Sequence, residues 1–181
     1  MNKKVGFIVL IALQLVILIA MFVKAFYPLW LGEDIVLKVV ARDPRDIFAG
    51  NYVVLNYSFN TIDTDSVKTD LDSTDLKNLH VGDKLYLELT KQGKYYEPLK
   101  LWKEKPSTAN KVMRVLVERE SYNKMVYLKG GIESYFTTHE HALALEKMTS
   151  WQESDSVTVE VTVKVAPDGA SRIAQVMPVK K

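Results

Sequence analysis

The chain contains no cysteine among its 181 residues. This absence excludes disulfide frameworks, metal sites built on thiolates and cysteine nucleophiles. It is compatible with a protein that does not depend on disulfide bonds for its stability.

An excess of charge of one sign is also missing from most of the chain. From Lys24 onward, 22 basic residues stand against 22 acidic residues. Domains that bind nucleic acids carry a basic excess or a basic stripe, because they neutralise phosphates. The sequence therefore predicts no nucleic-acid partner. A composition of 48% hydrophobic and 25% charged residues is globular rather than disordered.

Charged residues are absent from 5–23, where Gln14 is the one polar side chain. A helix of this length spans about 28 Å, which is close to the hydrocarbon thickness of a bilayer. A helix also satisfies its own backbone hydrogen bonds inside lipid. We therefore expect a transmembrane signal-anchor helix at 5–23, with the lipid bilayer as its partner.

The residues on either side of this run predict its orientation. Lys3 and Lys4 precede it, and basic flanks favour the cytoplasmic side. We expect a cytoplasmic region at 1–4, a juxtamembrane segment at 24–32 and an extracytoplasmic domain after it, which is periplasmic if the cell is Gram-negative. The alternative is a signal peptide cleaved after Ala25, although its apolar region would exceed the usual length of about 7–15 residues.

The pattern of residues 33–181 is typical of a β-rich domain. Its clearest strand has valine at every second position from 157 to 165, and a glycine turn joins expected strands at 84–90 and 95–102 into a hairpin. The sequence predicts a mainly β fold: one extracytoplasmic barrel-like or sandwich domain with one or two short helices. Further strands are expected at 35–40, 52–59, 112–118, 124–128 and 172–179, and the short helices at 72–79 and 139–148.

Residues 42–57, RDPRDIFAGNYVVLNY, are the least ordinary stretch of the chain. Three charged residues surround a proline between two expected strands, and Gly50 precedes the second strand. This stretch resembles the signature of the bacterial GDYXXLXY family, G-D-Y-x-x-L-x-Y, whose preceding D-P-R-D is intact. The signature stands here as Gly50-Asn51-Tyr52-Val53-Val54-Leu55-Asn56-Tyr57.

The resemblance extends over residues from about 35 to 178. The family's second block resembles 131–136, followed by an acidic helix that contains Glu146. The family implies a membrane-anchored accessory protein, often found beside polytopic membrane proteins, without an established activity. One residue departs from the signature, because its aspartate is Asn51 here. Asparagine preserves the hydrogen bonds of a turn but not a metal ligand or a base, which favours a structural role.

The two family blocks supply the candidate binding residues. An arginine between two aspartates would clamp an anionic group, or the three charges would form a turn that caps the backbone. The signature tyrosines would stack on a sugar, or lie half-buried in a strand. Glu133 and Tyr135 would share a face if 131–136 is a strand. The candidates are Asp43, Arg45, Asp46, Gly50, Asn51, Tyr52, Leu55, Tyr57, Glu133 and Tyr135.

Catalytic and metal-binding motifs are missing. Neither G-x-S-x-G nor H-E-x-x-H occurs, and His139 and His141 would point to nearly opposite sides of a helix. The sequence therefore predicts no metal and no cofactor. The favoured function is a binding or accessory domain that partners another integral membrane protein. The alternative is an envelope hydrolase with acid and base drawn from Asp43, Asp46, Glu133 and Glu146.

Overall fold

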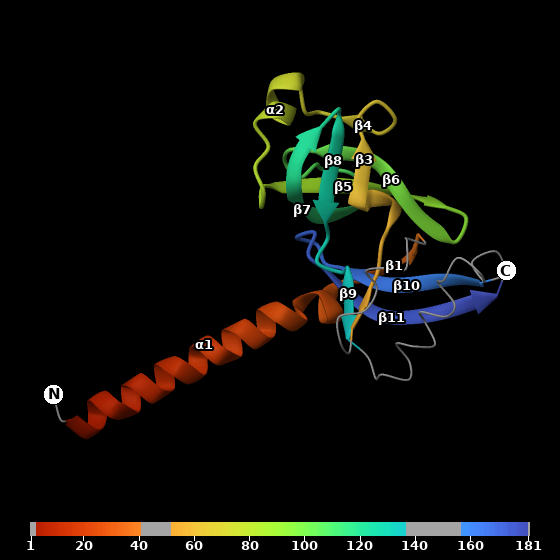
Figure 1. Ribbon diagram of the computed structural model, residues 1–181. Coiled ribbons are helices and arrows are strands. Elements are labelled where there is room, and N and C mark those ends of the chain that lie inside the picture. Colours follow the sequence, from red (N-terminus) through yellow and green to blue (C-terminus); the bar gives the residue numbers. More distant parts are fainter. Residues whose placement is uncertain (1–2, 41–51, 137–156, 181) are drawn as a thin grey trace.

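A β-rich body from which one long helix projects forms the fold (Figure 1). The computed structural model describes residues 3–40, 52–136 and 157–180. Strands predominate in these ranges, which confirms the predicted mainly β fold. Their apolar side chains form one continuous hydrophobic core.

The projecting helix, α1 (Lys3–Leu31), is longer than the predicted span at 5–23. Among the described residues it is the one helix long and apolar enough to cross a membrane, and its apolar window is unburied. Its last two turns cover most of the expected juxtamembrane segment, because they pack against the body through the buried ring of Pro28. The helix ends where Gly32 N donates to Pro28 O at 2.8 Å.

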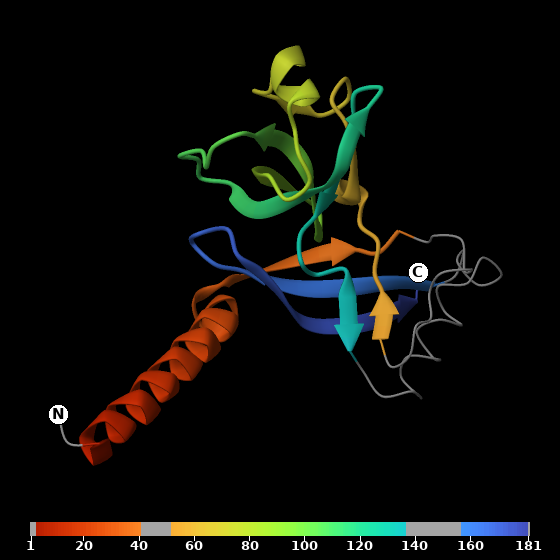
Figure 2. The ribbon, with the colours of Figure 1, turned by 60° about the vertical axis from the view of Figure 1, so that its left-hand side comes forward.

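The largest sheet has six strands in the order β3-β8-β7-β5-β6-β4 and curls into a half-barrel (Figures 1 and 2). Its strand pairs are antiparallel except β4 with β6. The predicted hairpin is confirmed as β5 and β6, with Gly93 at φ +63° in its turn. The strands are β3 (Thr61–Asp63), β4 (Lys68–Thr69), β5 (Lys84–Gln92), β6 (Tyr95–Trp102), β7 (Lys111–Tyr122) and β8 (Met125–Lys129).

A second sheet contains β1 (Glu33–Lys38), β10 (Val157–Val165) and β11 (Ser171–Lys180) in the order β1-β10-β11. The valines of β10 from 159 to 165 are buried, as their alternation predicts. The β10–β11 turn meets the half-barrel where Arg114 N donates to Gly169 O at 2.7 Å. A Cβ on Gly169 would lie 3.0 Å from Arg114 N, so this approach requires glycine.

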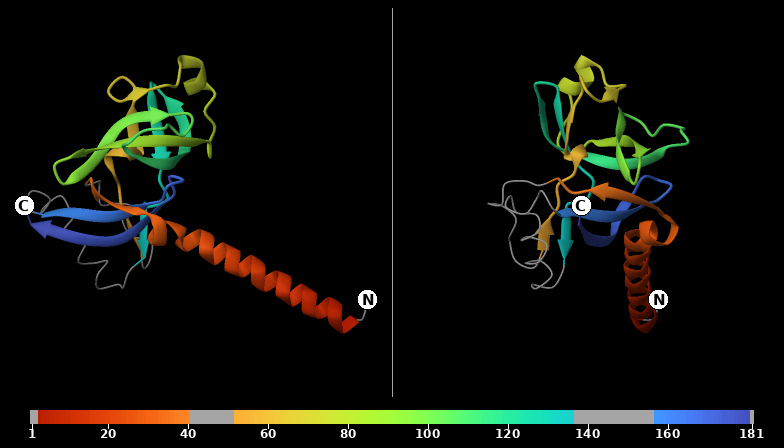
Figure 3. Two further views of the ribbon diagram at one scale, coloured as in Figure 1. Left: turned by 180° about the vertical axis from the view of Figure 1, so that it is seen from behind. Right: turned by 90° about the vertical axis from the view of Figure 1, so that its right-hand side faces the viewer.

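A short helix, α2 (Ser73–Lys77), lies at the far end of the half-barrel from the second sheet (Figure 3). Its amino end is capped by Asp72, whose Oδ1 accepts from Thr74 N at 2.7 Å and from Asp75 N at 2.6 Å. This confirms the short helix expected at 72–79. The helix expected at 139–148 lies outside the described residues.

The strand expected at 52–59 is much shorter in the structure. Only β2 (Tyr52–Val54) forms, and it pairs with β9 (Ser134–Phe136) in a two-stranded arm beside the second sheet (Figure 2). The 3₁₀ helix η2 (Ser58–Asn60) follows, because Asn60 Oδ1 accepts from Tyr57 N at 2.7 Å. This side-chain bond replaces a strand ladder bond.

Candidate functional site

The two sequence blocks that carry the resemblance lie side by side in the structure. The β2 and β9 strands pair with Val54 opposite Ser134. Beyond the strands, Leu55 N donates to Glu133 O at 2.8 Å, and the Tyr57 hydroxyl donates to Ile132 O at 2.9 Å. Blocks separated by more than 70 residues therefore form one continuous unit.

Glu133 joins this unit through its carboxylate. Oε1 accepts from Gly130 N at 2.5 Å and from Asn60 Nδ2 at 3.2 Å, and Oε2 accepts from Gly131 N at 2.9 Å. The turn depends on Gly131, whose φ of +77° is unfavourable for other residues. A strand across 131–136 is therefore wrong, because β9 begins only at Ser134 and leaves Glu133 in the turn before it.

Tyr57 and Leu55 are core residues. Tyr57 is 4% exposed, and its ring stacks on Phe59 with 5.1 Å between centroids and 6° between planes. Burial, and to a smaller extent the charge of Glu133, raises the pKa of the Tyr57 hydroxyl far above its ordinary value. The hydroxyl thus stays protonated as the donor to Ile132. Of the two interpretations of this tyrosine, the geometry favours packing over stacking on a sugar.

A cavity of about 470 Å³ opens beside this unit. Val54 and Asn56 of the signature line one part of it, and Glu133 lines another. Glu118 and Arg119 of β7 add exposed charges of opposite sign to its wall. Such a cavity has the side chains to hold a polar segment or small ligand through hydrogen bonds and ion pairs.

Arg119 is held in position by an aromatic ring. Its guanidinium carbon lies 3.7 Å from the centroid of the Tyr127 ring on β8. The sequence analysis did not single out Arg119 or Glu118, because they lie in β7, over 60 residues from the signature. The one signal for them was the run of three charges at 118–120, directly after the mostly apolar residues 112–117.

A comparison with known families matches residues 14–176 to the family described as GDYXXLXY protein. The chain belongs to the GDYXXLXY family. The match includes the carboxyl-terminal half of α1 and both blocks that form the unit around Glu133. Neither the curated proteins nor the solved structures gave a match.

The charged part of the GDYXXLXY signature lies outside the described residues. This applies to Asp43, Arg45, Asp46, Gly50 and Asn51, and also to Glu146, so their roles stay predictions. Of the remaining candidates, Tyr52 pairs with Phe136 through its backbone, and Tyr135 is half-buried opposite Val53. The structure thus brings together Tyr52, Leu55, Tyr57, Glu133 and Tyr135.

Two carboxylates that the sequence analysis did not single out are buried in this GDYXXLXY domain. Glu88 of β5 accepts hydrogen bonds from Trp102 Nε1 and Asn110 Nδ2 at 2.7 Å and from Thr108 Oγ1 at 2.9 Å. Burial alone raises its pKa, but these bonds, together with the charge of Lys100, bring the pKa below its ordinary value. Glu88 therefore stays ionised and holds the loop after β6 in place.

Glu160 of β10 is satisfied in a similar way. The Tyr95 hydroxyl donates to its Oε1 at 2.7 Å, and Lys94 Nζ lies 2.6 Å from Oε2. Burial raises its pKa, but the contacts with Lys94 and Tyr95 outweigh that effect and lower it. The burial of both carboxylates is therefore explained by the hydrogen bonds and ion pairs that they form within the domain. Among the described residues, no group of three or more His, Cys, Asp or Glu is placed to hold a metal ion.

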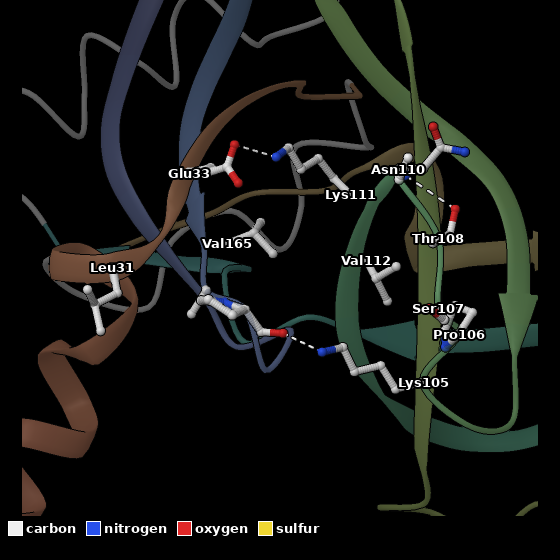
Figure 4. A pocket seen from close by; sticks show the side chains of 13 residues that line it. Leu31, Glu33, Lys105, Pro106, Ser107, Thr108, Asn110, Lys111, Val112 and Val165 are labelled. Carbon is white, nitrogen blue, oxygen red and sulfur yellow. Dashed lines mark hydrogen bonds and ion pairs between the residues drawn. The ribbon is translucent and has the colours of Figure 1, made fainter.

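A second cavity, of about 370 Å³, lies where α1 enters the domain (Figure 4). Leu31 and Glu33 line one side, and the loop from 105 to 111 lines the other. Two lysines cross the cavity: Lys111 pairs with Glu33, and Lys105 Nζ donates to Pro167 O at 2.5 Å. These contacts tie the base of the helix and the β10–β11 turn to the half-barrel.

Proposed function

We propose that this protein is a single-pass accessory protein whose β domain binds another integral membrane protein outside the cytoplasm. One observation carries the proposal: α1 passes from the apolar run into the domain without a linker. Arg172 of β11 donates from its guanidinium to Ala25 O at 2.5 Å and lies 4.9 Å from the centroid of the Phe26 ring. The domain is therefore attached to the helix as one piece.

The length of α1 supports a position of the domain close to the bilayer. Its 29 residues extend for about 43 Å, whereas a hydrocarbon core is about 30 Å thick. The last two turns then lie in the headgroup region, and β1 begins directly after them at Glu33. A fixed orientation at the membrane surface suits recognition of another membrane protein.

An aromatic stack supports the orientation and the retention of the helix. Phe26 stacks on Phe22 at 4.3 Å and on Trp30 at 6.1 Å between centroids. Aromatic residues favour the membrane–water interface, and this stack lies at the end of the run opposite Lys3 and Lys4. The helix continues on both sides of Ala25, and Arg172 donates a hydrogen bond to the carbonyl oxygen of that residue. Both observations favour a retained anchor over cleavage after Ala25.

The cavity beside the signature is the proposed contact surface for the partner. Glu118 and Arg119 are exposed there and lie next to the two family blocks. Glu133 already accepts three hydrogen bonds, so its carboxylate is a positioning group. Of the residues named for the alternative of an envelope hydrolase, Glu133 is the one that the structure describes, and its three hydrogen bonds favour a positioning role.

Topology is the first test of the proposal. Alkaline phosphatase fused after Lys181 should be active, and the full-length protein should resist extraction from membranes by alkaline carbonate. Activity of a cytoplasmic reporter at the same position would reverse the orientation. A mature amino terminus at Phe26 would exclude the anchor.

Capture of the partner is the second test. Full-length protein crosslinked in native membranes and purified in detergent should retain an integral membrane protein. Arg119→Ala should reduce this recovery, whereas Lys129→Ala, an exposed change on β8, should not. Equal recovery with both variants would remove the cavity from the contact surface.

A further inference from the structure

The amide of Gln14 is the feature that the β domain leaves unexplained. Gln14 lies midway between Lys4 and Lys24, ten residues from each. It is exposed on α1, and among the described residues its side chain forms no hydrogen bond. At 1.5 Å per residue, each flanking lysine is about 15 Å away along the helix axis.

Lipid does not satisfy this amide. A glutamine side chain reaches only about 5 Å, on the scale of the C–C bond lengths of the chain, so it ends well inside the hydrocarbon core. An amide without a hydrogen-bonding partner in such a medium costs several kcal/mol on hydrocarbon transfer scales, of order 4–8. Glutamines in membrane helices accordingly form hydrogen bonds across to other helices.

The face that carries Gln14 is the face over which the domain leans. With 3.6 residues per turn, Ala25 lies three turns further along the same side of α1, and Gly32 directly follows the last helical residue, Leu31. Arg172 of β11 binds the carbonyl oxygen of Ala25. A Cβ on Gly32 would lie 3.0 Å from Cβ of Lys164 on β10. The contact at Ala25 therefore places β11 on the Gln14 side of α1.

The position of the domain decides which kind of helix can lie beside Gln14: the α1 of a second copy, or a helix of another protein. In a parallel dimer of two copies joined through Gln14, helix axes would lie about 8–10 Å apart. Each domain would then occupy the space through which the last two turns of the other α1 must pass. A helix that ends in a short loop at the membrane surface fits beneath the domain without this conflict.

We propose that Gln14 binds a hydrogen-bonding side chain at mid-membrane depth on a transmembrane helix of the integral membrane partner, beneath the overhanging domain. The inference rests on the accessory function proposed above and assigns its intramembrane contact. Leu18, one turn from Gln14, lies on the contact face. Val16, two residues from Gln14, lies on the opposite face at a similar depth.

The experiment places a photo-crosslinking phenylalanine analogue at Leu18 or at Val16 of the full-length chain in native membranes. The Leu18 position should give an adduct whose partner peptide, identified by mass spectrometry, lies in a transmembrane segment with a polar side chain. Gln14→Leu should reduce the adduct about three- to thirty-fold, the range expected for one interhelical hydrogen bond. Gln14→Asn should retain it.

The controls separate this inference from the function on which it rests. Resistance of each variant to carbonate extraction shows that the anchor is inserted, and an extractable chain contradicts the proposed function itself. With the anchor inserted, an equal adduct from Val16, an adduct unchanged by Gln14→Leu, or no adduct from Leu18 overturns the inference. An adduct of two copies of this chain overturns the choice of occupant.

Discussion

The helix α1 and the strand β10 are similar in apolar composition and opposite in environment. Side chains of α1 such as Leu10 and Ile19 are each 62% exposed, whereas Val161 and Val163 of β10 are fully buried. A helix forms its hydrogen bonds internally, so it can present apolar side chains on every side to lipid. A strand needs neighbours, and β10 has β1 and β11 on its two edges. Backbone pairing thus decides which apolar segment belongs to the core.

The same comparison applies to polar groups within apolar surroundings. Glu88 in the half-barrel is 6% exposed and accepts three hydrogen bonds from its own chain. Gln14 in α1 has no partner among the described residues. The buried carboxylate of the domain is therefore satisfied by its own chain, whereas our proposal assigns the Gln14 amide a partner outside this chain.

The largest expected effect comes from placing a charge on β10. Val161→Asp buries a carboxylate without a partner and should cost more than about 4 kcal/mol of unfolding free energy, enough to unfold a domain of ordinary stability. Circular dichroism and urea titration of the full-length protein in detergent measure this. Gln175→Asp, an exposed change opposite Thr162, should behave like the wild type. A folded Val161→Asp protein would mean that this face of β10 is not core.

A charge on α1 should act on membrane insertion instead of folding. Leu13→Arg, next to the middle of the run, should cost about 2.5–3.5 kcal/mol of insertion free energy. Carbonate extraction should then release part of the protein, while the domain keeps its resistance to trypsin. Leu13→Phe is the apolar control. Loss of protease resistance in Leu13→Arg would mean that the two regions do not fold independently.

A smaller loss of unfolding free energy is expected when the buried carboxylate of Glu88 is neutralised. Glu88→Gln retains one acceptor oxygen and loses the charge, so it should reduce the unfolding free energy at pH 7 by about 1.5–3 kcal/mol. Urea titrations of wild type and variant measure the difference, with the exposed Glu120→Gln as control.

The pH dependence gives this prediction a sign. The pKa of Glu88 is lowered in the folded state, whereas an unfolded glutamate titrates near about 4.3. Its stabilising contribution is therefore complete above the unfolded pKa and is lost as the pH falls through the folded pKa. The gap between wild type and Glu88→Gln should narrow below about pH 4. A gap that widens in acid would contradict the hydrogen-bonded, ionised state.

Local patterns in the sequence were sufficient for the elements with strong periodicity. The valines of β10 and the leucines of β5 alternate at the period of a strand, and the structure buries both sets of side chains, in keeping with that alternation. The extension of α1 to Leu31 was not predictable in this way. Its last turns contact Arg172, which is 147 residues from Ala25 in the sequence, and no local pattern records such a contact.

The candidate site was predictable only in part, because it too depends on contacts between residues far apart in the sequence. The sequence motifs identified Glu133 and Tyr57, and the structure brings both into one unit. The turn at Gly131 and the cap from Asn60 shorten the expected strands, because local side-chain and glycine geometry compete with strand pairing. Arg119 joins the cavity through the tertiary fold, which no local pattern encodes.

The smallest expected effect is at the hydroxyl of Tyr57, which joins the two family blocks. Tyr57→Phe removes the donor to Ile132 O while keeping the ring stacked on Phe59, and should reduce the unfolding free energy by about 1 kcal/mol at neutral pH. Tyr127→Phe on β8 is the control, because it also removes a tyrosine hydroxyl but keeps the ring that Arg119 contacts.

The pH dependence tests the same hydroxyl. Because the pKa of Tyr57 is raised in the folded state, the stabilisation from its hydroxyl is complete below the unfolded pKa of about 10 and is lost as the pH rises toward the folded pKa. Urea titrations should therefore show the gap between wild type and Tyr57→Phe closing above about pH 10. A gap that persists unchanged at high pH would mean that the hydroxyl is not the buried link between the blocks.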